Sequence, residues 1–178
     1  IADNLNKRYG TDYGADNLYM TCGAAASLNI ALAALIEEPS DEVVVLAPFF
    51  PEYTVFIESQ GGKMVLVEAR DDMQLHAEDV EKAITKNTRA VLINTPNNPA
   101  GVIYSKEALE ELAAMLEKKS KENGRPIYIL SDEPYRELVL VDDAEVAWVP
   151  SIYDNTVVCY SWSKSLSLPG ERIGYILS

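Results

Sequence analysis

The chain has 178 residues, of which 48% are hydrophobic and 24% are charged, a balance typical of a globular domain with a sizeable core. Its formal net charge is −13 and no long basic run is present, which argues against binding to nucleic acid or to an anionic membrane surface. We expect no membrane partner, because no apolar run reaches membrane-spanning length and no signal peptide is recognisable.

Short apolar runs alternate with helical stretches along the first half of the chain. Gly23 opens the first helix of this pattern, Pro48 and Pro51 break the second strand, and the pair Gly61-Gly62 turns the chain into the third. In chain order, the pattern predicts a strand at 18–21, a helix at 24–37, a strand at 43–47, a helix at 52–60, a strand at 63–67, a helix at 77–85 and a strand at 90–94.

The second half begins with a longer predicted helix. Ser105 is a good N-cap and Gly124 ends the helix. Apolar residues at i, i+3, i+4 and i+7 form its core-facing stripe, namely Leu109, Leu112, Ala113 and Leu116. Three further strands are predicted, at 126–130, 156–160 and 173–177.

The seven predicted strands are short and apolar and show no polar alternation, which indicates burial on both faces. We therefore predict an α/β fold with three layers, α/β/α, around a seven-stranded and mostly parallel sheet. Only a short, helix-poor loop separates residues 160 and 173, so one antiparallel strand is expected at or near the end of the sheet.

The sequence contains two cysteines, Cys22 and Cys159, each at the end of a predicted strand. In a chain of this size they are interpreted as buried free thiols in a reducing, cytoplasmic compartment. No group of Cys and His residues has metal-ligand spacing, so no metal site is predicted.

A cluster of reactive side chains follows the sixth predicted strand. It contains Ser161, Ser163, Lys164 and, eight positions further on, Arg172. An arginine can hold a phosphate bidentately, serines can donate hydrogen bonds to it, and a lysine beside it can attack a carbonyl. For this stretch alone, a solvated Ser/Lys loop is an equally good interpretation.

The other strand ends support the first interpretation, because ligands of such sheets bind beyond the carboxyl ends of the strands. Gly23 precedes a helix whose free amides can hold a phosphate, and Phe50 offers a flat apolar face. If the ligand carries a hydroxylated pyridine ring, Asn98 and Tyr135 can form hydrogen bonds with the oxygen of the ring hydroxyl. The carboxylate of Asp132 favours a protonated nitrogen in such a ring. Together these groups match pyridoxal 5'-phosphate (PLP).

Each of these residues also has a simpler interpretation when it is considered alone. Phe50 and Tyr135 can be packing residues, Asn98 suits ordinary turn chemistry, and Asp132 can cap the turn that follows it. The glycine at 23 is needed for a tight turn in any case.

Five motifs in a fixed order resemble a known family. They are TCGAAA at 21–26, APFFPEY at 47–53, NTPNNPAG at 94–101, SDEPY at 131–135, and SWSK at 161–164 continued by ERIG at 171–174. The chain resembles the large domain of class I and II aminotransferases, which are fold-type-I PLP enzymes of the aspartate aminotransferase superfamily. The match extends over essentially the whole chain.

The resemblance implies a role for each candidate residue. Lys164 is the Schiff-base lysine, Asp132 pairs with the pyridine nitrogen, and Phe50 stacks on the ring. Asn98 and Tyr135 contact the ring hydroxyl oxygen. The phosphate is bound by Gly23, Ala24, Ser161, Ser163 and Arg172. Many relatives have a hydroxyl or lysine in place of Ala24, so contact there is expected through the backbone alone.

The resemblance further implies a homodimer that moves an amino group between an amino acid and a 2-oxo acid. Residues 1–178 correspond to the PLP-binding large domain, without the N-terminal segment and the C-terminal small domain of the family. We therefore expect the chain alone to bind PLP weakly and to transaminate poorly. Three alternatives remain open: a PLP-dependent carbon–sulfur lyase, an aminotransferase-like effector domain of a transcription regulator, and an α/β domain without PLP.

Overall fold

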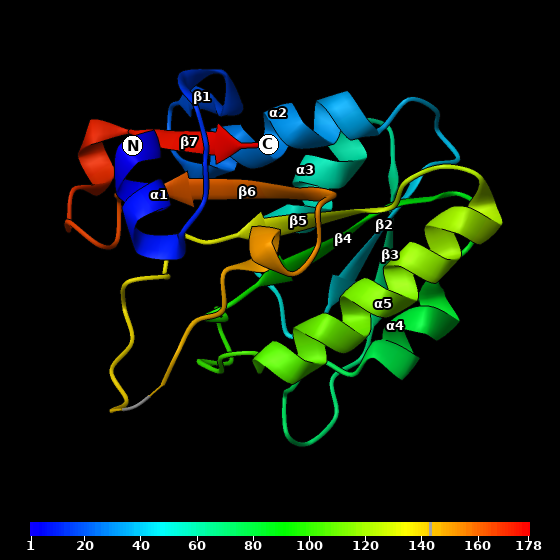
Figure 1. The fold of residues 1–178 in the computed structure, drawn as a ribbon. Coiled ribbons are helices and arrows are strands. Elements are labelled where there is room, and N and C mark those ends of the chain that lie inside the picture. The colour runs from blue at the N-terminus through cyan, green and yellow to red at the C-terminus, as the bar shows by residue number, and fades with distance from the viewer. Residues whose placement is uncertain (143) are drawn as a thin grey trace.

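The computed structural model describes residues 1–142 and 144–178. Seven strands form one sheet in the spatial order β1-β7-β6-β5-β4-β2-β3. In chain order the strands are β1 (Leu18–Thr21), β2 (Glu42–Leu46), β3 (Lys63–Val67), β4 (Thr88–Asn94), β5 (Tyr128–Asp132), β6 (Thr156–Ser161) and β7 (Gly174–Leu177). Figure 1 shows β4, β5 and β6 ending on the same side of the molecule.

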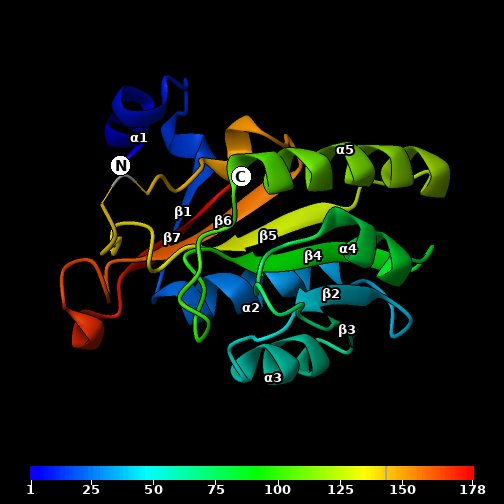
Figure 2. The same ribbon diagram turned by 90° about the horizontal axis from the view of Figure 1, so that it is seen from below.

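Helices cover both faces of this sheet, as Figure 2 shows. The helices α2 (Ala24–Leu35) and α3 (Glu52–Ser59) lie on one face. The helices α1 (Ala2–Tyr9), α4 (Ala77–Ala83) and α5 (Lys106–Asn123) lie on the other. The described residues also form three short 3₁₀ helices, η1 (Ala15–Asn17), η2 (Val149–Ser151) and η3 (Pro169–Glu171). The predicted three-layer α/β/α architecture is therefore confirmed.

The strand directions also agree with the sequence analysis. β7 runs antiparallel to both of its neighbours, β1 and β6. The other neighbouring pairs, β6–β5, β5–β4, β4–β2 and β2–β3, are parallel. For β7 to run parallel to β6, the chain would need a long crossover connection between them. The segment from β6 to β7 contains only the short helix η3, so β7 is antiparallel. β7 is next to the edge strand β1, so the expected antiparallel strand lies near the end of the sheet.

Some predicted element bounds and one expectation about the cysteines need correction. β4 begins two residues earlier than predicted, and α2 and α4 each end two residues earlier. β5 begins at Tyr128 and ends at Asp132, two residues later than predicted. Pro126 has no backbone N–H, and the backbone N–H of Ile127 donates to Ser120 Oγ at 2.9 Å, so neither donates to a neighbouring strand. The expectation of two buried thiols is wrong for Cys22. It is exposed in the turn beyond the end of β1, whereas Cys159 is buried on β6.

Alternate residues of the strands face the two helical layers. On β4, Val91 and Ile93 pack in the core under α5, whereas Ala90 and Leu92 pack in the core under α2 and α3. The predicted stripe of α5 is buried, Ser105 Oγ accepts the N-terminal hydrogen bond from Ala108, and Gly124 ends the helix with φ 71°. This double coverage explains why the strands carry apolar residues on both faces.

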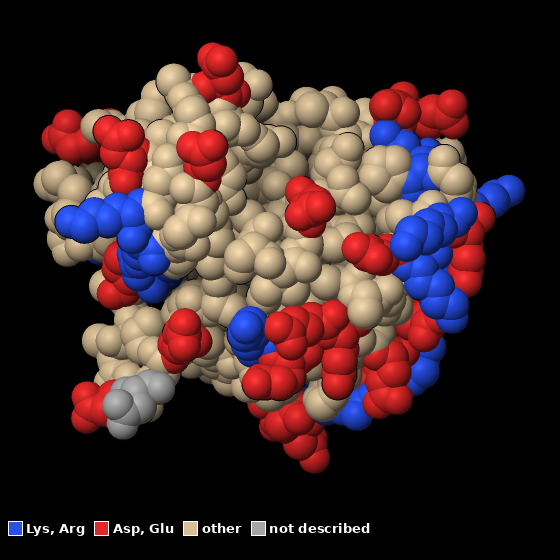
Figure 3. Space-filling model, in the orientation of Figure 1, with Lys and Arg blue, Asp and Glu red and all other residues tan. Residues whose placement is uncertain are grey.

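The chain carries a formal net charge of −13. Acidic side chains are spread over the face in Figure 3, with basic side chains between them. Among the described residues, no helix combines the length and the hydropathy needed to cross a membrane.

Candidate functional site

A cavity of about 210 Å³ lies where β4, β5 and β6 end. Nine of the ten candidate residues line it: Ala24, Phe50, Asn98, Asp132, Tyr135, Ser161, Ser163, Lys164 and Arg172. The tenth, Gly23, lies immediately before α2, where an added Cβ atom would meet the guanidinium of Arg172. The fold therefore brings together residues that are up to about 150 positions apart in the sequence, because parallel strands end at one edge of the sheet.

Asp132 is the last residue of β5 and is 6% exposed. Its Oδ2 accepts a hydrogen bond of 2.5 Å from the hydroxyl of Tyr53, and its Oδ1 is buried without a hydrogen-bond partner. Burial raises the pKa of this carboxyl from 3.8 to about 7, although the bond from Tyr53 lowers it. A buried carboxylate oxygen without a partner is costly, which indicates a ligand group that pairs with it.

Two contributing residues were not singled out in the sequence. Tyr53 is the last residue of the motif at 47–53 and lies in the first turn of α3. From there its hydroxyl donates a hydrogen bond to Asp132. Asn94 ends β4 and begins the motif at 94–101. Its Nδ2 donates to the backbone oxygen of Asp132 at 2.8 Å, and its Oδ1 accepts from the backbone N–H of Asn98 at 2.7 Å. Asn94 thus ties together two candidate residues from neighbouring strands.

Lys164 lies in the loop after β6 and is exposed. Its Nζ is 5.8 Å from the centre of the Tyr135 ring, which places it over the same cavity as Asp132. The next residue, Ser165, shares a hydrogen bond of 3.0 Å with the hydroxyl of Tyr160 on β6. This bond anchors the loop to the strand that precedes it.

Arg172 and Gly23 meet at the rim of the cavity near the start of α2. The Arg172 guanidinium donates to the backbone oxygens of Cys22 at 3.1 Å and Pro169 at 3.2 Å. A Cβ atom at Gly23 would lie 2.8 Å from Arg172 Nη2, and Gly23 has φ 92°. Glycine is required here because of both the close approach and the backbone conformation. The arginine and the free amides of α2 form a site suited to an anion.

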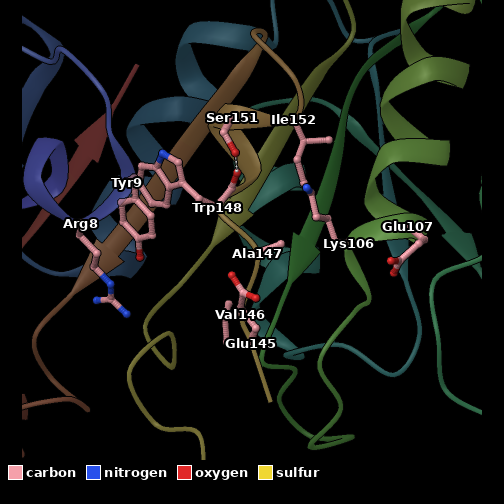
Figure 4. Close-up of a pocket in the computed structure, with 10 residues that line it drawn as sticks. All are labelled: Arg8, Tyr9, Lys106, Glu107, Glu145, Val146, Ala147, Trp148, Ser151 and Ile152. Carbon is pink, nitrogen blue, oxygen red and sulfur yellow. Dashed lines mark hydrogen bonds between the residues drawn. The ribbon is translucent and has the colours of Figure 1, made fainter. Parts of the chain in front are cut away.

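A larger hollow of about 520 Å³ lies elsewhere, between α1, the start of α5 and the segment before η2 (Figure 4). Its walls hold the stacked rings of Tyr9 and Trp148, with centroids 4.2 Å apart, and surface charges that include Arg8 and Lys106. None of the ten candidate residues is among the described residues that line it. The smaller cavity, with its convergent polar groups, is therefore the candidate site.

Comparison with known proteins agrees with this geometry. The family model "Aminotransferase class I and II" matches residues 1–178. The aspartate aminotransferase of Thermotoga maritima is 38% identical over 181 residues, which cover 100% of this chain and 46% of the relative. The chain thus spans about half the length of the curated relatives that it matches.

Solved structures show the same relationship. An aminotransferase from Eubacterium rectale has a TM-score of 0.97 at 54% identity, covering 99% of this chain and 44% of that one. The Thermotoga maritima aspartate aminotransferase has a TM-score of 0.89 at 37% identity, covering 99% and 46%. The resemblance found in the five sequence motifs is confirmed, and this chain belongs to the aminotransferase class I and II family.

Proposed function

We propose that residues 1–178 form the PLP-binding large domain of an aminotransferase that moves an amino group between an amino acid and a 2-oxo acid. One observation carries the proposal. Asp132, whose buried Oδ1 has no hydrogen-bond partner, lines the same cavity as Lys164 and Arg172. A carboxylate, a lysine and an arginine around one cavity match the ring nitrogen, the aldehyde and the phosphate of PLP. The names of the relatives support the same activity.

The residues present fit this cofactor. Asp132 would pair with the ring nitrogen, Phe50 would cover the ring, and Asn98 and Tyr135 would contact the ring hydroxyl oxygen. The phosphate would be held by Gly23, Ala24, Ser161, Ser163 and Arg172. When bound, PLP supplies an aldehyde carbon for amines and a ring that withdraws electrons from the substrate's α-carbon.

The side chains of this chain contribute binding and proton transfer. Lys164 Nζ would bind the aldehyde carbon of the cofactor, and as a free amine it would accept a proton from the substrate's α-carbon. Asp132 stabilises a proton at the ring nitrogen through its negative charge. Arg172 would neutralise the phosphate and so help to anchor the cofactor.

These 178 residues are expected to transaminate poorly by themselves. Arg172 is the only arginine among the described residues that line the cavity, and we assign it to the phosphate. No second guanidinium then remains there for the substrate carboxylate, so substrate binding requires further chain. We also propose, on the family resemblance, that the working protein is a cytoplasmic homodimer.

The test is to incubate the protein with PLP, reduce it with borohydride, and map the labelled peptide by mass spectrometry. Label on Lys164 alone supports the proposal, and label scattered over surface lysines of the full-length protein contradicts it. Transfer of the amino group to a 2-oxo acid then identifies an aminotransferase. Release of pyruvate from a β-thio amino acid without an acceptor would instead identify a carbon–sulfur lyase.

Replacement of Gly23 by alanine is expected to weaken PLP binding by roughly 10- to 100-fold. The new Cβ would displace the Arg172 guanidinium, and a hydrogen bond to a charged group contributes about 1.5–3 kcal/mol. The measurement is a PLP titration followed by absorbance. Gly124→Ala is the control, because Gly124 also has positive φ (71°) but has nothing within 4 Å of an added Cβ. Equal losses in the two variants would show that backbone strain alone is responsible.

A further inference from the structure

Tyr53 is 1% exposed, and its hydroxyl donates a hydrogen bond of 2.5 Å to Asp132 Oδ2. The ring is held between two neighbours from the preceding turn. Its centroid is 6.5 Å from that of Phe49, in a stacked arrangement, and 5.7 Å from that of Phe50, edge to face. A buried ring packed in this way has little rotamer freedom, so the position of the hydroxyl is set by the fold.

The two oxygens of Asp132 consequently have different surroundings. Oδ2 is satisfied by Tyr53, whereas Oδ1 is buried and has no partner. We propose that Tyr53 is a positioning residue of the cofactor site, whose hydroxyl fixes the Asp132 carboxylate so that Oδ1 remains available to the ring nitrogen of PLP. The inference rests on the proposed function and adds to it a residue that need not touch the cofactor.

Four titratable groups surround Asp132. Tyr53 approaches from α3, Cys159 is its register partner on β6, Glu133 follows it in the chain, and Tyr135 lies in the loop after β5. Burial raises the pKa of Asp132, the bond from Tyr53 lowers it, and the charge of Glu133 raises it. Tyr53 is therefore the group in this set that favours the carboxylate over the neutral acid.

This electrostatic role distinguishes positioning from simple packing. Without the hydroxyl of Tyr53, the Asp132 carboxylate becomes a stronger base, because one hydrogen bond to its charged form is lost. The proton shared between Asp132 and the ring nitrogen would then move toward Asp132. A change that only loosened the core would lower stability without moving that proton.

The experiment compares the full-length protein with Tyr53→Phe and Tyr153→Phe. Tyr153 is a matched control: it is 3% exposed, and its hydroxyl donates to the backbone oxygen of Ile127 at 2.7 Å, before the start of β5. Each protein is titrated with PLP, and its melting temperature is measured without PLP. The ring-nitrogen resonance is then recorded with PLP that is isotopically labelled at that atom.

We expect Tyr53→Phe to bind PLP about tenfold more weakly and to shift the ring-nitrogen resonance toward the unprotonated position. Tyr153→Phe should lower the melting temperature and leave both PLP readouts unchanged. The inference is overturned if Tyr53→Phe leaves the resonance where it is, or if Tyr153→Phe moves it equally. Failure of the unsubstituted protein to take PLP on Lys164 would overturn the proposed function as well.

A second variant keeps the test decisive if Tyr53→Phe folds poorly. Incorporation of a ring-fluorinated tyrosine at position 53 retains the ring and the hydroxyl but makes the hydroxyl a stronger donor. The Asp132 carboxylate is then stabilised further, so the ring nitrogen should become more protonated than in the unsubstituted protein. An unchanged or opposite shift would contradict the positioning role.

Discussion

Replacement of Lys164 by arginine is expected to abolish transamination by the full-length protein. A guanidinium stays protonated, so it can neither bond covalently to the aldehyde of PLP nor accept the proton of the substrate's α-carbon. The expected loss in kcat is at least roughly 10⁴-fold, at the upper end of what a positioned acid–base group contributes. The measurement is a steady-state assay with an amino acid and a 2-oxo acid.

Borohydride trapping provides an independent readout for the same variant. The labelled peptide that contains residue 164 should disappear in Lys164→Arg, while non-covalent PLP binding persists through Arg172 and the serines of the cavity. Lys121→Arg is the matched control, because Lys121 lies in the last turn of α5 and its side chain is 79% exposed. Trapping at another lysine together with retained activity would show that Lys164 has been assigned wrongly.

Replacement of Asp132 by asparagine is expected to lower activity and to raise the stability of the cofactor-free protein. The activity falls because a neutral amide cannot stabilise a proton at the ring nitrogen. Removal of a preorganised electrostatic group typically costs roughly 10²–10³-fold in kcat. The stability rises because the buried carboxylate, one oxygen of which has no partner, is no longer present at neutral pH.

The expected gain in stability of the cofactor-free Asp132→Asn variant depends on pH. Burial raises the pKa of Asp132 from 3.8 to about 7, so the folded state holds the proton more tightly than the unfolded state does. The stability that this group contributes is fully present below pH 3.8 and is lost as the pH rises through about 7. The shift corresponds to about 4 kcal/mol between these limits.

Urea unfolding of the cofactor-free protein at pH 5 and pH 8 would measure this difference. We expect Asp132→Asn to be more stable than the unsubstituted protein at pH 8, by up to about 4 kcal/mol, and to differ much less at pH 5. Saturation with PLP should reverse the order, because the unsubstituted protein gains more binding free energy. A variant that is less stable at both pH values would contradict the raised pKa.

Much of the architecture follows from local pattern. Helices cover both faces of the sheet, so the strands carry apolar residues on both faces. Such continuous apolar runs are typical of strands in a parallel sheet, which is why the sheet type could be predicted. The caps of α5 are determined by Ser105 and Gly124, whose chemistry acts within a few residues. The nine candidate residues that line the cavity were identifiable because most of them lie at or just after the end of a strand, and strand ends converge in this fold class.

The fold class, the family and the set of residues at the strand ends could therefore be inferred from the amino-acid pattern. The contacts made by these residues follow from the three-dimensional packing. The contact between Tyr53 and Asp132 joins residues 79 positions apart, and the bond from Asn94 to Asp132 depends on the register between β4 and β5. Such contacts depend on how helices and strands pack, and no local propensity or periodicity encodes that packing.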